Sequence, residues 1–131
     1  MPPPGNVDVV RDFIDALNEG RVDELIEGVD PDFEWMPLED SPIAHHYRGR
    51  EQVRHYVEDW LATFDSLRLE LEEVRQVGDH VITAVHGHGR GRLSGVELHS
   101  SFCQVWSISG GTPTRMREYR NLQQGLASLP A

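Results

Sequence analysis

The spacing of hydrophobic residues divides the chain into a helical first half and a strand-rich second half. In the first half apolar residues recur every three or four positions, as on the buried face of a helix, and predict helices over residues 9–17, 22–29 and 53–64. The first helix ends at Asn18-Glu19-Gly20, and the second ends at Asp30-Pro31 because proline pushes the preceding residue out of the helical region. FEWMPL predicts a short strand, and the Pro- and Gly-containing segment up to Gly49 predicts a long loop.

Beyond Ser66 the hydrophobic period changes to two. Leu67, Leu69 and Leu71 alternate with charged residues, and further strands are predicted over 80–92, 96–108 and 114–122. Glycine-containing turns separate these strands, and QQGLASLPA predicts a short C-terminal tail. Three helices, one strand and an antiparallel meander predict an α+β domain in which a curved sheet wraps around the helices.

The stretch HGHGRGRLSG places histidine and arginine at every second position of a predicted hairpin. If Ser94-Gly95 forms a two-residue tip, Leu93 opposes Val96 and Gly87 opposes Phe102. Gly87 and Gly89 then point inward, where they leave room for a ligand. The outer face carries the polar set His86, His88, Arg90, Arg92, Glu97, His99, Ser101 and Cys103. A slip of one residue would reverse both faces, because side chains alternate along a strand.

The same histidines leave a metal site open as an alternative. His86 and His88 on one strand and His99 on the next could converge on zinc or nickel, since alternate residues and a cross-strand neighbour share one face. The sequence offers no acidic residue that clearly orients these imidazoles. We therefore interpret them as interface or solvated residues and expect neither a metal nor a cofactor.

Composition narrows the classes of partner. The chain has 131 residues, which is enough for a single core, and we expect residues 1–6 to be a disordered tail and residues 7–131 to be one domain. Twelve basic against 22 acidic residues give a net charge of −10, which argues against binding to nucleic acid or to an anionic membrane. Cys103 is the only cysteine, so neither an internal disulfide nor a Cys-rich zinc site can form. Without a signal-like start or a long apolar run, we expect a cytoplasmic protein.

Several phrases of the chain resemble a known family. FIDALNEGRVDELIEGVDPDFEW, HYRGREQVRHYVEDW, GRGRLSGVELHSSFCQVWSI and RMREYRN are similar to the SnoaL-like group of the nuclear transport factor 2-like superfamily. The resemblance implies a cone-shaped fold, with three N-terminal helices packed in a strongly curved, mostly antiparallel sheet. It also implies a homodimer that forms through the outer face of the sheet. The fold hosts isomerases, cyclases and non-catalytic binding domains, so it specifies function only weakly.

The resemblance assigns candidate site residues by position. Steroid isomerases of the superfamily place a tyrosine at Phe13, a carboxylate near Met36 and a second oxyanion donor at Gln104. A phenyl or thioether group can neither donate to an oxyanion nor accept a proton, which argues against steroid isomerisation. When GTPTRMRE is aligned with the last strand of the cyclases, Glu118 occupies the position of their acid/base aspartate. The position of their catalytic histidine falls close to Gln104.

Two functions follow as alternatives. In the first, a hydrophobic small molecule binds, Glu118 transfers a proton next to its carbonyl, and Gln104 orients the carbonyl oxygen. In the second, the same fold is a non-catalytic dimeric binding module, and Glu118 forms a buried ion pair with Arg120, Arg54 or Arg90. The expected pocket opens near the loop from His45 to Tyr47 and is lined by Glu118, Gln104, Trp35, Tyr56, Trp60, Phe102, Trp106 and Arg120.

Overall fold

The computed structural model describes residues 5–38 and 46–129, and these form four helices and six strands. In chain order the elements are α1 (Asn6–Asn18), α2 (Val22–Glu27), β1 (Glu34–Met36), β2 (Tyr47–Arg48), α3 (Arg50–Thr63), β3 (Phe64–Val77), β4 (His80–Gly91), β5 (Glu97–Ser109), β6 (Thr112–Tyr119) and α4 (Leu122–Ala127). The start of α1 at Asn6 lies within the predicted tail, and residues 1–4 lie outside the described part of the chain.

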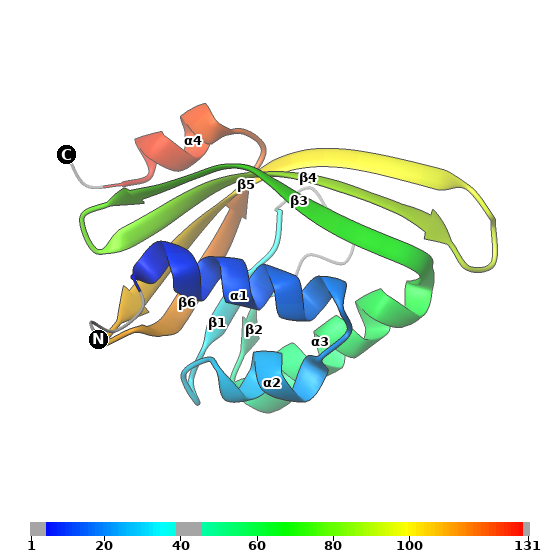
Figure 1. The fold of residues 1–131 in the computed structure, drawn as a ribbon, viewed down its shortest axis with the longest axis horizontal. Helices are drawn as coiled ribbons and strands as arrows, with labels where there is room; N and C mark the ends of the chain where they lie inside the picture. The colour runs from blue at the N-terminus through cyan, green and yellow to red at the C-terminus, as the bar shows by residue number, and fades with distance from the viewer. Residues whose placement is uncertain (1–4, 39–45, 130–131) are drawn as a thin grey trace.

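The six strands form one curved sheet in the order β2-β1-β6-β5-β4-β3. Neighbouring strands are antiparallel except for β1 and β6, which are parallel. Figure 1 shows α1 and α3 on the concave side of this sheet and α4 on the opposite side. The predicted α+β class, with N-terminal helices enclosed by a curved and mostly antiparallel sheet, is confirmed.

The core lies between α1 and the concave face. The apolar stripe of α1 is buried at Val10, Phe13, Ile14 and Leu17, as its helical spacing predicts. The ring of Phe13 makes edge contacts with Trp106, at 4.8 Å between centroids, and with Trp35, at 5.8 Å. Both tryptophans are almost fully buried in this cluster.

Asn18 ends α1 and attaches the helix to the sheet. Its Nδ2 donates to the carbonyl oxygen of Leu69 at 2.9 Å, and its Oδ1 accepts from the Leu69 amide at 2.8 Å. This pair of bonds satisfies the main chain of β3 where it passes the helix. It also fixes Leu69, whose side chain is buried, on the concave face.

The β4–β5 hairpin differs from the predicted register by two residues. Gly87 pairs with Ser100 and Arg90 pairs with Glu97, and the connection between the two strands spans residues 92–96. Arg92 leaves the ladder because its amide donates to the Thr63 carbonyl at 2.9 Å and its guanidinium donates to the carbonyl of Phe64 at 3.1 Å. A shift of two preserves the facing of every residue, so the predicted outward position of His86 and His88 holds.

Two short elements were missed by the hydrophobic pattern. The predicted tail contains α4, which Asn121 caps by accepting from the Gln124 amide at 2.9 Å. The predicted loop contains β2, whose two residues pair with β1. A six-residue helix and a two-residue strand are too short to establish a period, which explains both omissions.

The prediction that Cys103 lies on an open outer face of the sheet is wrong. Its side chain is buried in a second apolar cluster with Ile82 and Val105, against which residues of the C-terminal segment pack. A Cβ on Gly125 of α4 would meet the Cys103 Sγ at 2.4 Å, so only glycine permits this approach. Burial raises the pKa of the Cys103 thiol to about 11.

Candidate functional site

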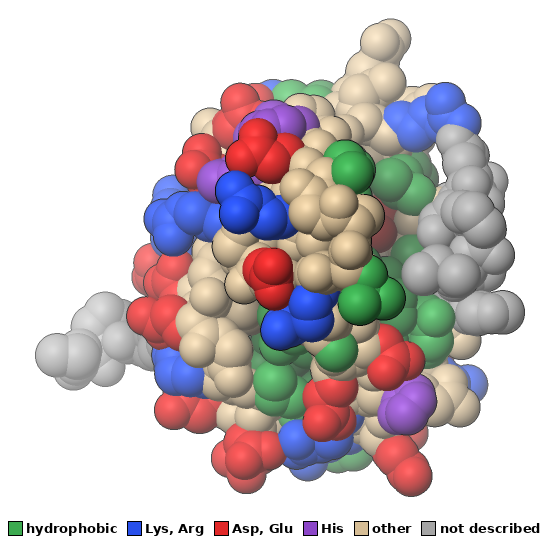
Figure 2. Space-filling model, turned by 90° about the vertical axis from the view of Figure 1, so that its right-hand side faces the viewer, with side chains coloured by type: hydrophobic (Ala, Val, Ile, Leu, Met, Phe, Trp, Pro, Cys, Tyr) green, Lys and Arg blue, Asp and Glu red, His purple; other side chains and the backbone are tan. Residues whose placement is uncertain are grey.

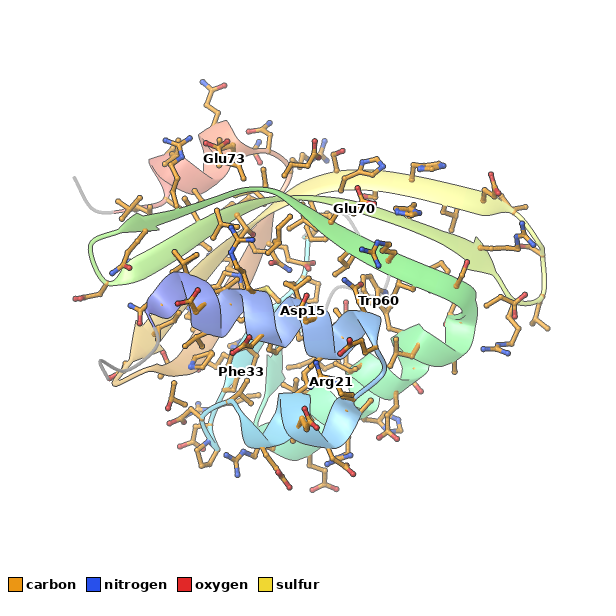
Figure 3. All side chains as sticks on the ribbon, viewed as in Figure 1. Asp15, Arg21, Phe33, Trp60, Glu70 and Glu73 are labelled. Carbon is orange, nitrogen blue, oxygen red and sulfur yellow. The ribbon has the colours of Figure 1, made fainter. Side chains whose placement is uncertain are left out.

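A cavity of about 220 Å³ lies on the concave face between α3 and the sheet. Its lining comes from α3, the strands β3, β4 and β5, the end of β6 and the segment after β1: Pro37, Leu38, Tyr56, Trp60, Phe64, Leu67, Leu69, Gly87, His88, Gly89, Leu98, Ser100, Phe102 and Glu118. In Figure 3, Trp60 of α3 lies on the concave side of the sheet, whereas Glu70 lies on the opposite side. The lining is mostly apolar, as in sites for small hydrophobic molecules.

The cavity is open toward the end of the β4–β5 hairpin. Leu98 lines it and is 50% exposed, and Leu93 and Val96 beyond it are also exposed. Figure 2 looks onto this end of the molecule and shows hydrophobic side chains along one side of it, with histidine, arginine and acidic side chains along the other. The predicted opening involves His45, which lies outside the described residues, while Tyr47 stacks on Tyr56 at 4.2 Å between centroids.

The structure places four of the eight predicted site residues around the cavity: Tyr56, Trp60, Phe102 and Glu118. Trp35 and Trp106 lie deeper in the core, and their large apolar surfaces pack against Phe13. Arg120 is exposed, beyond the end of β6. These three residues do not line the cavity, so their predicted place in it needs correction.

Gln104 is buried behind the cavity rather than exposed to it. Its Oε1 accepts from the Trp106 indole N–H at 3.2 Å and lies 3.2 Å from the Thr83 hydroxyl. The acceptor atom of its amide is thus engaged in the core, and the residue is only 1% exposed. Gln104 pairs across the ladder with Glu118 and so lies beside it without reaching a ligand in the cavity.

Glu118 brings a carboxyl group into the apolar cavity. Desolvation by burial raises its pKa from 4.5 to about 7, against a smaller opposing effect of the Leu38 amide, which donates to Oε1 at 3.3 Å. The Trp35 indole N–H also opposes the rise, although it makes no hydrogen bond of ordinary geometry and is buried. This carboxyl can therefore both bind and release a proton near neutral pH.

The expected ion pair of Glu118 is not formed. Arg54 contacts Asp23 at 2.7 Å, and Arg90 contacts Glu97 at 3.6 Å. Among residues 5–38 and 46–129 no salt bridge includes Glu118. An unpaired carboxyl in an apolar environment is unusual for a purely structural residue.

Tyr56 supplies a second polar group to the cavity, and it was predicted only as a lining residue, without any chemical role. Burial, and then the nearby Glu118 charge, raise the pKa of its phenol. The phenol accordingly keeps its proton and remains a hydrogen-bond donor. Its ring is held by Trp35 at 5.2 Å and by Tyr47, which fixes the direction of the hydroxyl.

Gly87 and Gly89 face the cavity as predicted, but for different reasons. A Cβ on Gly87 would meet the tip of Leu69 at 2.9 Å, and this flexible side chain can move. A Cβ on Gly89 would meet the main-chain oxygen of Ser66 at 2.8 Å, and this atom cannot move without breaking the ladder. Gly89 therefore permits the close approach of β3, whereas at Gly87 a larger residue could be accommodated if the Leu69 side chain moved.

The outer-face histidines form a cluster of their own. The rings of His86, His88 and His99 lie 5.6 to 6.0 Å apart, with His86 Nδ1 at 3.1 Å from the Ser101 hydroxyl and His88 Nε2 at 3.3 Å from Glu70. No group of metal-ligating side chains able to hold an ion occurs in the part of the chain that the structure describes. His99 stacks with both His86 and His88, and its Nδ1 lies 3.4 Å from the His86 Nε2.

The cavity includes residues that the sequence did not single out as site residues. Leu98 and Ser100 lie on the inward parity of β5, and Leu67 and Leu69 lie on the inward parity of β3. The period-two pattern contained this signal. Which of the inward residues border open space depends on the curvature of the sheet, and the pattern does not specify curvature.

The SnoaL-like domain family matches residues 10–116, which is most of the chain. The chain belongs to the SnoaL-like domain family. This membership supports a small-molecule-binding or cyclase/isomerase-type protein. The match ends at Met116, two residues before Glu118, so it does not extend to the carboxyl in the cavity. No curated protein matches the chain.

Solved structures share the fold at low sequence identity. A hypothetical protein with a ketosteroid isomerase-like fold from Catenulispora acidiphila DSM 44928, in complex with trimethylamine, is 18% identical with a TM-score of 0.77 and 93% of each chain covered. TerC, co-crystallized with polyporic acid, is 18% identical with a TM-score of 0.77, over 93% of this chain and 95% of that one. A protein named as a SnoaL-like polyketide cyclase, from Jannaschia sp. CCS1, is 18% identical with a TM-score of 0.77, over 99% and 100%.

The helices of the described residues have at most 14 residues. None of them has the length and apolar character that a membrane crossing needs.

Proposed function

We propose that this protein binds a hydrophobic carbonyl compound in the cavity and that Glu118 transfers a proton at the carbon next to the carbonyl. The observation that carries the proposal is the carboxyl itself, which lies in an apolar cavity, has no cationic partner among the described residues and has a pKa of about 7. A base with a pKa near the working pH is both sufficiently ionised and sufficiently basic to act. Two fold neighbours hold small molecules, which supports a small-molecule ligand for this protein.

In the proposed reaction the Glu118 carboxylate takes a proton from the α-carbon. The electron pair left on carbon moves to the carbonyl oxygen and forms an enolate. The Tyr56 phenol donates a hydrogen bond to that oxygen, which is the role expected from sequence for Gln104. The protonated Glu118 then returns its proton, to the same carbon in an exchange or to another carbon in an isomerisation.

The test is α-proton exchange of acetophenone in deuterated buffer, followed by NMR. We expect the rate enhancement over the uncatalysed exchange to be at least about 100-fold smaller for Glu118→Gln than for the wild type, because the amide cannot accept the proton. Glu58→Gln is the matched control, since Glu58 is an exposed acid on α3 outside the cavity. The rate should rise with pH through about 7, as Glu118 loses its proton.

The non-catalytic binding module is the alternative outcome of the same experiment. Equal exchange rates for wild type and Glu118→Gln, with acetophenone still bound, would remove the enzyme and leave the binding protein. The composition of the lining favours this alternative. Among the described residues whose side chains face the cavity, only Glu118 and Tyr56 could act as an acid or a base.

We also propose that a second copy of the chain binds the outer face of the sheet. The polar surface around His86, His88 and His99 includes Glu70, Arg90 and Glu97, so it has charges of both signs, and a self-complementary interface needs both. The helix α4 covers the part of this face at Cys103, which restricts the interface to the part near the hairpin.

A further inference from the structure

We propose that the cavity prefers a hydrophobic ligand that carries a permanent positive charge, such as a quaternary ammonium group, over an uncharged ligand of the same shape. This inference deepens the proposed function, because it concerns the ligand of the same cavity. It depends on binding alone and does not require the proton transfer.

The lining carries one negative group and no basic side chain among the described residues that could balance it. Glu118 supplies the carboxylate, and neither arginine nor lysine contributes to the lining. His88 borders the cavity from a strand position whose side chain points to the outer face, where its Nε2 contacts Glu70. A cationic ligand would supply the countercharge that this part of the chain does not provide.

Aromatic rings line the path from the open end of the cavity toward Glu118. Phe64 meets Trp60 at 6.1 Å between centroids with an interplanar angle of 84°, and Trp60 stacks with Tyr56 at 6.4 Å. Tyr56 is close enough to Glu118 for the two groups to interact electrostatically. The face of an aromatic ring attracts a cation and not a neutral alkyl group, and indole does so most strongly.

The two donors that approach the carboxyl leave most of its charge uncompensated. The Leu38 amide donates at 3.3 Å, which is long for a hydrogen bond to a carboxylate, and the Trp35 indole N–H is not aligned for one. A neutral ligand would displace water from the ionised Glu118 without forming an interaction that replaces the lost hydration. An ammonium group would favour the ionised form, while the net charge of −10 attracts cations to the protein.

The pH response follows from the groups that face the carboxyl. Glu118 faces Tyr56 from α3, the Trp35 indole from β1 and the Leu38 amide, and its cross-strand partner on β5 is the uncharged Gln104. Tyr56 keeps its proton throughout the neutral range, so Glu118 is the group that titrates. The preference for a cation should therefore be present above pH 7 and decline below it.

The experiment compares phenyltrimethylammonium with tert-butylbenzene, its neutral isostere. Binding to the full chain at pH 8 is followed by two-dimensional NMR of the indole N–H signals. We expect the cation to bind at least about 10-fold more tightly, and the ratio to fall toward one at pH 5.5 and in Glu118→Gln. Glu58→Gln, the matched control, should keep the wild-type ratio. Trp60→Leu should weaken the cation more than the isostere.

Each result bears on the proposal. Equal affinities of the two compounds at pH 8, tighter binding of the isostere, or no binding of either compound would overturn it, as would a ratio that survives in Glu118→Gln. Proton exchange is scored separately: a cation preference without exchange removes the proposed reaction and keeps this inference. Exchange without a cation preference removes this inference and keeps the proposed reaction.

Discussion

Replacing Glu118 by glutamine should stabilise the protein at alkaline pH, although the substitution removes a functional group. In the folded chain the carboxyl holds its proton up to about pH 7, whereas in the unfolded chain it releases the proton near 4.5. The folded state therefore binds more protons between these two values, and its stability falls as the pH rises through that window. Glutamine has the same shape, carries no charge and avoids the cost of a desolvated carboxylate.

The size of the effect follows from the two pKa values. A difference between 4.5 and about 7 corresponds to about 3 kcal/mol, at about 1.4 kcal/mol for each pH unit. At pH 8 Glu118→Gln should thus be more stable than wild type by up to about 3 kcal/mol. Below pH 4.5 the two proteins should be equally stable, because the carboxyl is then neutral in both states.

Urea unfolding at pH 8, 6 and 4, followed by circular dichroism, measures this difference. With a slope of about 2 kcal/mol per molar urea, the midpoint of the variant at pH 8 should be higher by about 1.5 M. Glu58→Gln controls for loss of an exposed acid and should change the midpoint little. A destabilised Glu118→Gln at pH 8 would refute the reasoning, because it would mean that the carboxylate is stabilised by an ion pair.

Two further predictions concern the outer face of the sheet. Gly125→Ala should lift α4 from Cys103, because the new Cβ would meet the thiol at 2.4 Å, and the thiol should then react at least about 10-fold faster with a disulfide reagent; unchanged reactivity would contradict the packing of α4. The proposed dimer should form through the outer-face surface around His86, His88 and His99. Light scattering decides this, and a monomer at every pH would reject the interface.

Alternation in the sequence was sufficient to predict which side chains share a face of the sheet. The register was displaced by two residues, because Arg92 binds the end of α3 and not its cross-strand neighbour. That contact depends on tertiary structure and is invisible to a strand period. The facing of His86 and His88 nevertheless followed from the sequence, since a displacement by an even number preserves it.

The site was predicted only in part. Tyr56, Trp60, Phe102 and Glu118 border the cavity as expected, because each occupies an inward position. Trp35 and Trp106 point inward too, but Phe13 covers them. The depth of an inward residue depends on how closely a helix packs against it, which no pattern along one strand contains. The missing ion pair of Glu118 likewise required the positions of Arg54 and Arg90.

At Gly87, His88 and Gly89 a single main chain separates the inner cavity from the outer face of the sheet. The inner cavity is bounded by His88 and Gly89, and so is a shallow outer hollow of about 110 Å³ lined also by Ser66, Arg90, Glu97 and His99. The two glycines contribute no side chain to the wall, so a molecule inside and a molecule outside would rest on the same peptide groups. Displacement of those peptide groups by an occupant on one side would alter the surface on the other side, and any resulting coupling between the two binding free energies would be equal in both directions.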